Sequence, residues 1–179
     1  LNASQIIVTK NFDVIIIGMG PSGLVLAGLL ASYGIEVGIF EKNKSTVKEP
    51  RAVSIDDESL RILQSFSLHK AVLENVSQNY GSHYYDTKGK LFLKVEPNSC
   101  ENGFFKRNAF DQPSFESTLR NHLKGKENIN INFSHTLISI KNENNCVIAN
   151  FEDSKGIKKS ILGRYLVGCD GGQSTVRDL

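Results

Sequence analysis

The stretch FDVIIIGMGPSG, residues 12–23, decides the fold. Its first six residues are mostly apolar and β-branched, which is typical of a strand buried in a parallel sheet. The next six carry three glycines spaced as G-x-G-x-x-G, at Gly18, Gly20 and Gly23. Residues 24–33 are again mostly apolar and predict a helix. The stretch therefore predicts a strand, a tight turn and a helix in succession.

A second apolar run, residues 35–40, predicts a neighbouring strand that ends at Glu41. A glycine-rich turn inside such a βαβ unit lets a diphosphate approach the backbone, where the helix N-terminus favours negative charge. Pro21 and Ser22 belong to that turn. Glu41 stands where an acidic side chain accepts hydrogen bonds from ribose hydroxyls. The pattern predicts a Rossmann-like dinucleotide-binding core, without distinguishing FAD from NAD.

The rest of the chain predicts further helices and a β-rich last third, so the fold class is α/β with additional β-strands. Strands are expected at residues 103–107, 129–133, 136–140, 146–151 and 158–168, a β-hairpin within 80–95, and helices at 69–73 and 111–124. A helix after the acidic cluster 56–58 is expected to bury Leu60, Ile62, Leu63 and Phe66. We interpret that cluster as helix capping rather than acid–base chemistry. The tyrosines at 80, 84 and 85 could belong to a binding surface, but we interpret them as packing within strands.

The composition excludes several classes of protein. The net charge of +2 gives no reason to expect a nucleic-acid or membrane partner, and no apolar run reaches the roughly 18 residues that span a bilayer. Without a recognisable signal peptide, a cytoplasmic location is expected. The three cysteines are read as reduced, partly buried thiols. The scattered histidines give no reason to expect a metal site.

Four segments together resemble a known family. They are GMGPSG with Glu41, PRAVSIDDESLR at 50–61, FFKRNAFDQPSFE at 104–116, and YLVGCDGGQSTVR at 165–177. In this order and spacing they are similar to the single-component FAD-dependent aromatic hydroxylases, the family of 4-hydroxybenzoate hydroxylase. Within that family they look closest to the 3-(3-hydroxyphenyl)propionate hydroxylase branch. The resemblance identifies the dinucleotide as FAD.

The resemblance implies roles for residues outside the glycine-rich turn. Arg51 is expected beside the FAD diphosphate and ribityl chain, because a guanidinium offers a fork of donors to phosphate oxygens. Gln112 is expected to hydrogen-bond the ribityl or phosphate region. Arg107 could approach the cofactor or could be an ordinary surface cation, and the sequence leaves both readings open.

The Asp-Gly step at Asp170 and Gly171 follows an apolar strand and resembles the family's motif for binding FAD and the nicotinamide cofactor. Lys42, beside Glu41, is included in the expected cofactor-binding set. These residues are expected to bind FAD rather than to carry protons, so no catalytic residue is expected in this stretch.

The resemblance implies an enzyme that uses FAD, NADH or NADPH, and O2 to hydroxylate a phenolic acid. It also implies that the full-length protein could form a homodimer. Two alternatives stay open: another FAD enzyme such as a halogenase or isoprenoid reductase, and a non-catalytic dinucleotide-binding module. Residues 1–11 are expected to be an extension and residues 12–179 an incomplete FAD-binding domain. The chain begins with Leu1 and ends in a turn of helix, so we expect an N-terminal fragment that is inactive alone.

Overall fold

A computed structural model of the chain describes residues 8–45 and 51–179. Most of the expected N-terminal extension and the last part of the loop before Arg51, including Pro50, lie outside the described residues. The chain divides into two compact units. The first contains residues 1–46 and 119–179, and the second contains residues 47–118. Each unit is described separately below.

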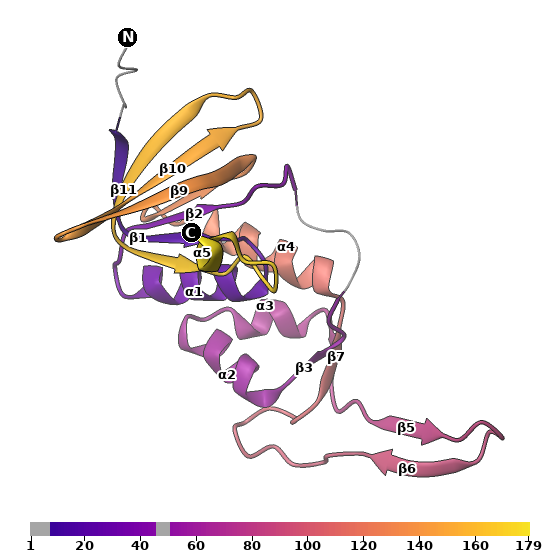
Figure 1. The fold of residues 1–179 in the computed structure, drawn as a ribbon. Helices are drawn as coiled ribbons and strands as arrows, with labels where there is room; N and C mark the ends of the chain where they lie inside the picture. The colour runs from indigo at the N-terminus through magenta and orange to yellow at the C-terminus, as the bar shows by residue number, and fades with distance from the viewer. Residues whose placement is uncertain (1–7, 46–50) are drawn as a thin grey trace, which may run out of the picture. The chain divides into compact units, whose positions relative to one another are not determined.

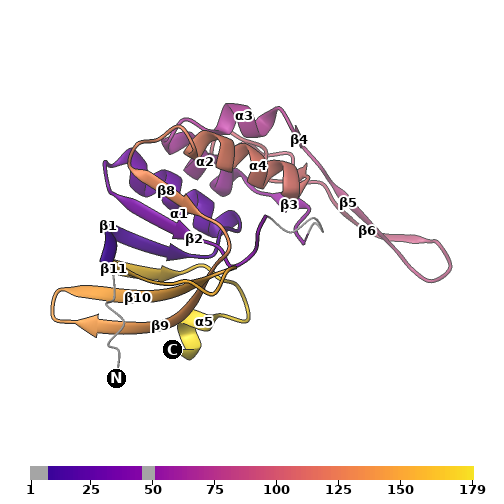
Figure 2. The same cartoon turned by 90° about the horizontal axis from the view of Figure 1, so that it is seen from above.

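A six-stranded sheet forms the centre of the first unit, in the order β8-β2-β1-β11-β10-β9. The strands are β1 (Val8–Ile17), β2 (Val37–Phe40), β8 (Ile129–Asn132), β9 (His135–Glu143), β10 (Cys146–Asp153) and β11 (Lys158–Gly168). The first four in spatial order run parallel, and β11, β10 and β9 form an antiparallel meander (Figure 2). The expected α/β fold with extra β-strands is confirmed.

Helix α1 (Pro21–Ser32) lies along β1 and β2 (Figure 1). Strand β1 has buried side chains on both faces: Ile15 and Ile16 have no exposed surface. Successive strand residues point to opposite faces. One face of β1 therefore packs beneath the helix, and the other contributes Ile15 and Ile17 to the hydrophobic core described next. The Asn128 amide donates to the carbonyls of Ala31 and Ile35, which joins the chain before β8 to the end of α1.

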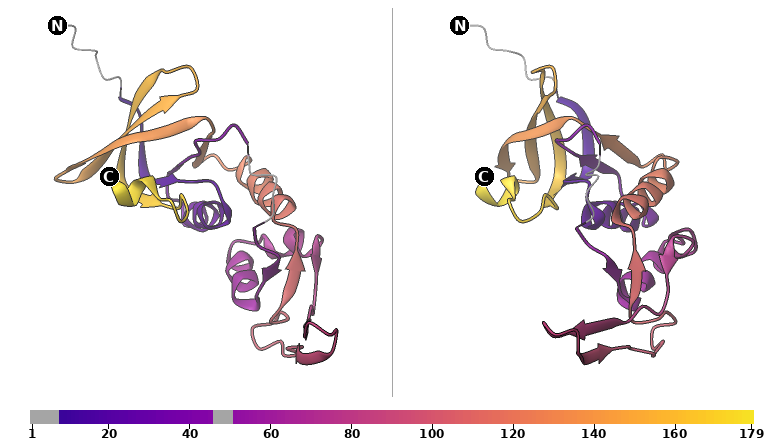
Figure 3. Two further views of the ribbon diagram at one scale, coloured as in Figure 1. Left: turned by 45° about the vertical axis from the view of Figure 1, so that its right-hand side comes forward. Right: turned by 90° about the vertical axis from the view of Figure 1, so that its right-hand side faces the viewer.

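The face of the sheet opposite α1 carries a hydrophobic core, to which strands of the parallel half and of the antiparallel meander both contribute. Its buried members are Phe12, Ile15, Ile17, Phe40, Leu137, Ala149, Phe151 and Ile161. Phe40 and Phe151 stack with ring centroids 4.3 Å apart, which joins the parallel half of the sheet to the antiparallel half. Figure 3 shows how β9 and β10 curl across this face.

The second unit contains a small sheet, a helix pair and a hairpin. Its elements are β3 (Ser54–Ile55), α2 (Asp57–Ser65), α3 (His69–Leu73), β4 (Val76–Ser77), β5 (Ser82–Tyr85), β6 (Leu91–Val95) and β7 (Asn108–Phe110). The sheet has the order β3-β7-β4, and β5 pairs with β6 as the expected hairpin. Helix α4 (Gln112–Leu123) begins at the end of this unit.

Several expectations were wrong in detail. The strand expected at residues 103–107 is instead β7, because Gly103 adopts φ 81° in a turn and strand pairing starts only at Asn108. Ile62 is 40% exposed and does not belong to the buried face of α2. Strand β1 begins at Val8 and α1 begins at Pro21, both earlier than expected. Proline is tolerated there because the first helical position needs no N–H.

Side chains near the hairpin and at one cysteine also differ from expectation. Tyr80, Tyr84 and Tyr85 are between 43% and 57% exposed rather than buried, although the Tyr84 ring lies 6.4 Å from that of Phe92 on the paired strand. Cys100 is exposed, whereas the other two cysteines are partly buried. The Asp56 carboxylate accepts a hydrogen bond from Ser59 N and caps α2, which confirms the capping interpretation.

Candidate cofactor-binding site

Two of the three motif glycines are required by the protein's own backbone. Gly18 has φ 101°, and a Cβ there would lie 2.4 Å from the carbonyl oxygen of Cys169. A Cβ on Gly23 would lie 2.1 Å from the carbonyl oxygen of Gly18. These contacts are shorter than atoms can tolerate, so larger residues at either position would push α1 and β11 away from the turn.

Gly20 differs, because its missing side chain leaves open space. It is the N-cap of α1 with φ −76° and ψ −176°, which any residue can adopt. Apart from the adjoining backbone, no atom of residues 8–45 and 51–179 lies within 4 Å of the position of a Cβ there. As the N-cap residue, Gly20 has no side chain to cap this helix end, and the first turn of the helix has no acidic residue. An uncapped N-terminus with space in front of it fits a diphosphate group.

Glu41 is tied to the same turn. Its Oε2 accepts a hydrogen bond from Met19 N at 3.0 Å, and its Oε1 accepts from Asn43 N at 2.9 Å. Glu41 Oε1 also accepts from Asn43 Nδ2 at 2.7 Å. A carboxylate has about four acceptor positions, so these three bonds leave one for a hydroxyl donor. Lys42, the next residue, is exposed. Glu41 is thus placed to stabilise the turn and to accept a bond from a ribose.

Replacing Glu41 by glutamine is expected to lower the free energy of unfolding by about 1–2 kcal/mol, since an amide cannot accept all the bonds made to the carboxylate. Urea unfolding of the chain measures this change. Glu36→Gln removes the same charge from an exposed side chain nearby and should leave the midpoint unchanged. Equal midpoints for the two variants would contradict the structural role of Glu41.

The Asp-Gly step lies beside the glycine-rich turn. Strands β1 and β11 are parallel neighbours, and Cys169 N donates to the carbonyl of Ile17 at 2.6 Å. A Cβ on Gly18 would lie 2.8 Å from the Cα of Asp170, so the two motifs are in contact. The carboxyl ends of parallel strands are the usual place for ligands in α/β sheets. Two segments far apart in the sequence therefore meet at one edge.

Asp170 organises its own loop. Its Oδ1 accepts from Ser174 Oγ at 2.7 Å and its Oδ2 accepts from Val176 N at 3.1 Å. Ser174 in turn caps α5 (Thr175–Asp178) by accepting from Arg177 N. Gly171 has φ 85°, a conformation that favours glycine. Both carboxylate oxygens thus shape the loop at the end of β11.

The pKa of Asp170 lies below its ordinary value of 3.8, because the hydrogen bonds from Ser174 and nearby backbone N–H groups outweigh the effect of burial, which acts to raise it. A depressed pKa means that the loop is stabilised at pH values above 3.8 and loses this stabilisation as pH falls through the folded value. An NMR titration of the Asp170 carboxyl and the Val176 amide is expected to give a common midpoint below 3.8. Asp170→Asn should remove that transition, and a midpoint at or above 3.8 would contradict the assignment.

Arg51 and Gln112 lie together within the second unit. Arg51 is exposed, whereas Gln112 is 9% exposed and accepts hydrogen bonds from Arg51 N and Ala52 N. The Arg107 guanidinium lies 5.6 Å from the centre of the Tyr80 ring. The two predicted cofactor residues of this unit are therefore neighbours, while Arg107 makes a cation–π contact.

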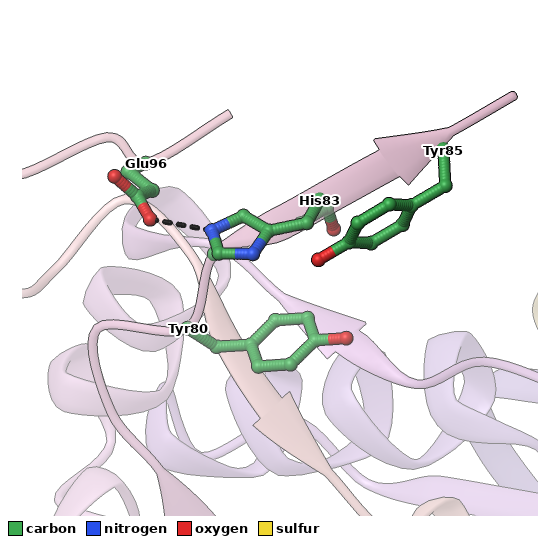
Figure 4. A pocket seen from close by; sticks show the side chains of 6 residues that line it. Tyr80, His83, Tyr85 and Glu96 are labelled. Carbon is green, nitrogen blue, oxygen red and sulfur yellow. Dashed lines mark hydrogen bonds and ion pairs between the residues drawn. The ribbon is translucent and has the colours of Figure 1, made fainter. Parts of the chain in front are cut away.

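A pocket of about 520 Å³ beside β5 was not expected from the sequence. Tyr80, His83, Tyr85 and Glu96 contribute side chains to it, and His83 Nε2 lies 2.7 Å from Glu96 Oε1 (Figure 4). None of the predicted cofactor residues lines this pocket. Nor does any cluster of three or more potential metal ligands occur within residues 8–45 and 51–179. Over the same residues, no helix is both long enough and apolar enough to cross a bilayer.

Comparison with known families identifies the domain. A family model described as an FAD binding domain matches residues 11–179. The chain therefore belongs to this family of FAD-binding domains. The resemblance to the aromatic hydroxylase family, and to its 3-(3-hydroxyphenyl)propionate hydroxylase branch, is confirmed by the curated relatives described next.

The chain is 36% identical over 165 residues to the 3-(3-hydroxy-phenyl)propionate/3-hydroxycinnamic acid hydroxylase of Comamonas testosteroni, covering 92% of this chain and 28% of that protein. It is 33% identical over 177 residues to the enzyme of the same name from Paraburkholderia xenovorans strain LB400, covering 99% of this chain and 28% of that protein. The chain thus spans less than a third of the length of these relatives.

Solved structures share the fold. The p-nitrophenol 4-monooxygenase PnpA from Pseudomonas putida DLL-E4 superposes with a TM-score of 0.86 at 23% identity, over 94% of this chain and 43% of that one. The flavin-dependent monooxygenase PieE, solved with FAD and substrate, gives 0.85 at 19%, over 96% and 32%. The Diels-Alderase PyrE3 gives 0.75 at 21%, over 92% and 33%. Because the last has a different reaction in its name, the fold alone does not specify the chemistry.

Proposed function

We propose that this chain is the FAD-binding part of a monooxygenase that uses NADH or NADPH and O2 to hydroxylate a phenolic acid, such as a compound resembling 3-(3-hydroxyphenyl)propionate. The observation that carries the proposal is the open N-terminus of α1 at Gly20, beside Glu41. The names of the relatives at 33–36% identity support the substrate class. Residues 12–179 would then belong to one FAD-binding domain.

In this proposal different residues of the first unit bind different parts of FAD. The turn formed by Gly18, Gly20, Pro21, Ser22 and Gly23 binds the diphosphate through backbone N–H groups and the helix dipole. Glu41 accepts a hydrogen bond from a ribose hydroxyl, and the Lys42 ammonium adds positive charge nearby. Asp170 and Gly171 present a small loop, already shaped by Ser174, to the ribityl side.

Within the second unit, the proposal rests on the resemblance and on the chemistry of the side chains. Arg51 is exposed and carries the planar fork of donors that suits phosphate oxygens. Gln112 is included among the residues that support FAD binding. None of these groups is assigned a proton transfer; FAD supplies the redox chemistry when bound, while the chain's residues bind and orient it.

A ligand series tests the proposal. FAD, FMN and NAD are titrated into the purified chain, and binding is followed by flavin absorbance and fluorescence or by calorimetry. FAD is expected to bind at least about tenfold more tightly than FMN, which lacks the adenosine half that the turn and Glu41 would bind. Tighter binding of NAD than of FAD, or equal binding of FAD and FMN, would overturn it.

The activity of the whole enzyme needs a separate assay. The longer protein that contains this domain is expected to oxidise NADH or NADPH and consume O2 faster when a phenolic acid is added, with release of a hydroxylated product. Halogenated product in the presence of chloride would instead support a halogenase. Gel filtration of the same protein tests whether it is a homodimer.

A further inference from the structure

The side chain of Gln112 is almost fully committed to partners inside the second unit. Its Oε1 accepts hydrogen bonds from Arg51 N and Ala52 N, both at 2.9 Å. Its Nε2 donates to Glu116 Oε1 at 2.8 Å, one helical turn further along α4. A glutamine side chain offers two lone pairs and two N–H groups. Three of these four are used by the protein, which leaves a single N–H for any ligand.

The position of Gln112 explains why a side chain is needed there. Strand β3 pairs with β7, and Phe110 N donates to the carbonyl of Val53. Strand β7 then ends and α4 begins at Gln112, so no strand backbone continues alongside Arg51 and Ala52. The hydrogen bonds of these two amides are partly shielded from water, and backbone N–H groups that lose access to water need protein acceptors. The side-chain carbonyl of Gln112 supplies one and extends the pairing by two residues.

Glu116 determines which way the amide points. Gln112 is 9% exposed and Glu116 is 4% exposed, so water has little access to either group. With Nε2 towards the carboxylate, Oε1 faces the two backbone donors. The opposite orientation would place the amide NH2 against two N–H groups and its oxygen against a carboxylate. Only one orientation satisfies all of these groups.

We propose that Gln112 and Glu116 act as a positioning pair that holds the backbone of Arg51 and Ala52, so that the exposed Arg51 guanidinium is presented to the diphosphate of FAD. Gln112 then affects FAD binding through Arg51. The ligand in this inference rests on the proposed function, whereas the backbone contact does not. Preorganising a flexible arginine lowers the entropy lost on binding.

Amide hydrogen exchange in the ligand-free chain tests the positioning pair without any cofactor. In Gln112→Leu the Arg51 and Ala52 amides are expected to exchange about 10 to 100 times faster than in the wild type. The Phe110 amide serves as an internal reference, because it is bonded to Val53 and should keep its protection. Asn121→Leu, at an exposed amide side chain in the same helix, should change neither signal. Unchanged exchange of Arg51 and Ala52 in Gln112→Leu would overturn the pairing.

Glu116 is tested by a conservative and a disruptive variant. Glu116→Gln keeps an acceptor oxygen for Gln112 Nε2, so protection of the Arg51 and Ala52 amides should largely persist. Glu116→Leu removes that acceptor and should accelerate exchange of both amides. If the two Glu116 variants behave alike, the carboxylate does not orient Gln112 and its part of the proposal fails.

A double-mutant cycle on FAD affinity separates positioning from direct contact. Gln112→Leu alone is expected to weaken FAD binding about tenfold. In an Arg51→Ala background the same change should have almost no further effect, because the group being positioned is gone. A full tenfold loss in that background would show that Gln112 contacts FAD itself. Absence of FAD binding by the wild type would instead reject the proposed function, while the exchange experiment would still decide the backbone contact.

Discussion

Gly20→Val is expected to weaken FAD binding at least about 100-fold, which corresponds to about 2.7 kcal/mol, while leaving the chain folded. The fold itself does not require a glycine at this position. The backbone angles suit any residue, and beyond the adjoining backbone no atom in the described part of the chain lies within 4 Å of the added Cβ. The valine side chain would occupy the space in front of the α1 N-terminus that we assign to the diphosphate.

The folded state of Gly20→Val is expected to lose no more than about 1 kcal/mol of stability, the usual difference between glycine and a poor N-cap residue. Gly125→Val is the matched control, because it adds the same side chain at another open glycine without a positive φ. That variant should bind FAD normally. Wild-type affinity in Gly20→Val would show that the diphosphate does not bind at this helix end.

Gly23→Ala, unlike Gly20→Val, is expected to act mainly on folding and to lower the free energy of unfolding by about 3 kcal/mol or more. The single added methyl would lie 2.1 Å from the carbonyl oxygen of Gly18 and 3.3 Å from Cys169 Cβ. The backbone of the turn cannot rotate away as a side chain could, so α1 must shift from β1. Chemical denaturation of the chain measures the loss.

Gly20→Ala provides the direct comparison for Gly23→Ala. It adds the same methyl group three residues earlier in the same turn, where the space is open. It should unfold within about 1 kcal/mol of the wild type. If Gly23→Ala unfolds at the same denaturant concentration as Gly20→Ala, the close packing between the turn and α1 is not what the structure indicates.

The core of the fold could be predicted from local sequence because each of its signals is local. The apolar run before Gly18, the glycine spacing and the acidic residue after the second run each reflect a nearby backbone constraint. The family resemblance implied that Asp170 binds the cofactor, but nothing local in 165–177 indicates the partner of its strand. The structure supplies that partner as β1.

What the sequence could not predict depends on contacts between distant residues. Ile62 and Leu60 are both apolar, but they lie about 200° apart around a helix with 3.6 residues per turn. Only tertiary packing decides which of them is buried. Similarly, Gln112 and Arg51 are far apart in the chain, and the pairing of β3 with β7 brings them together. A glutamine that accepts from two backbone N–H groups has no sequence pattern of its own.

An NMR titration of the isotope-labelled chain with FAD tests whether FAD binds at the N-terminus of α1, because it locates the ligand as well as detecting it. We expect saturable shifts concentrated in the amides of residues 18–24, at Glu41 and at Asp170 to Gly172. We also expect these shifts to disappear in Gly20→Val but not in Gly125→Val. Shifts concentrated instead around Tyr80, His83 and Glu96, or no shifts at any FAD concentration, would contradict binding at this helix end.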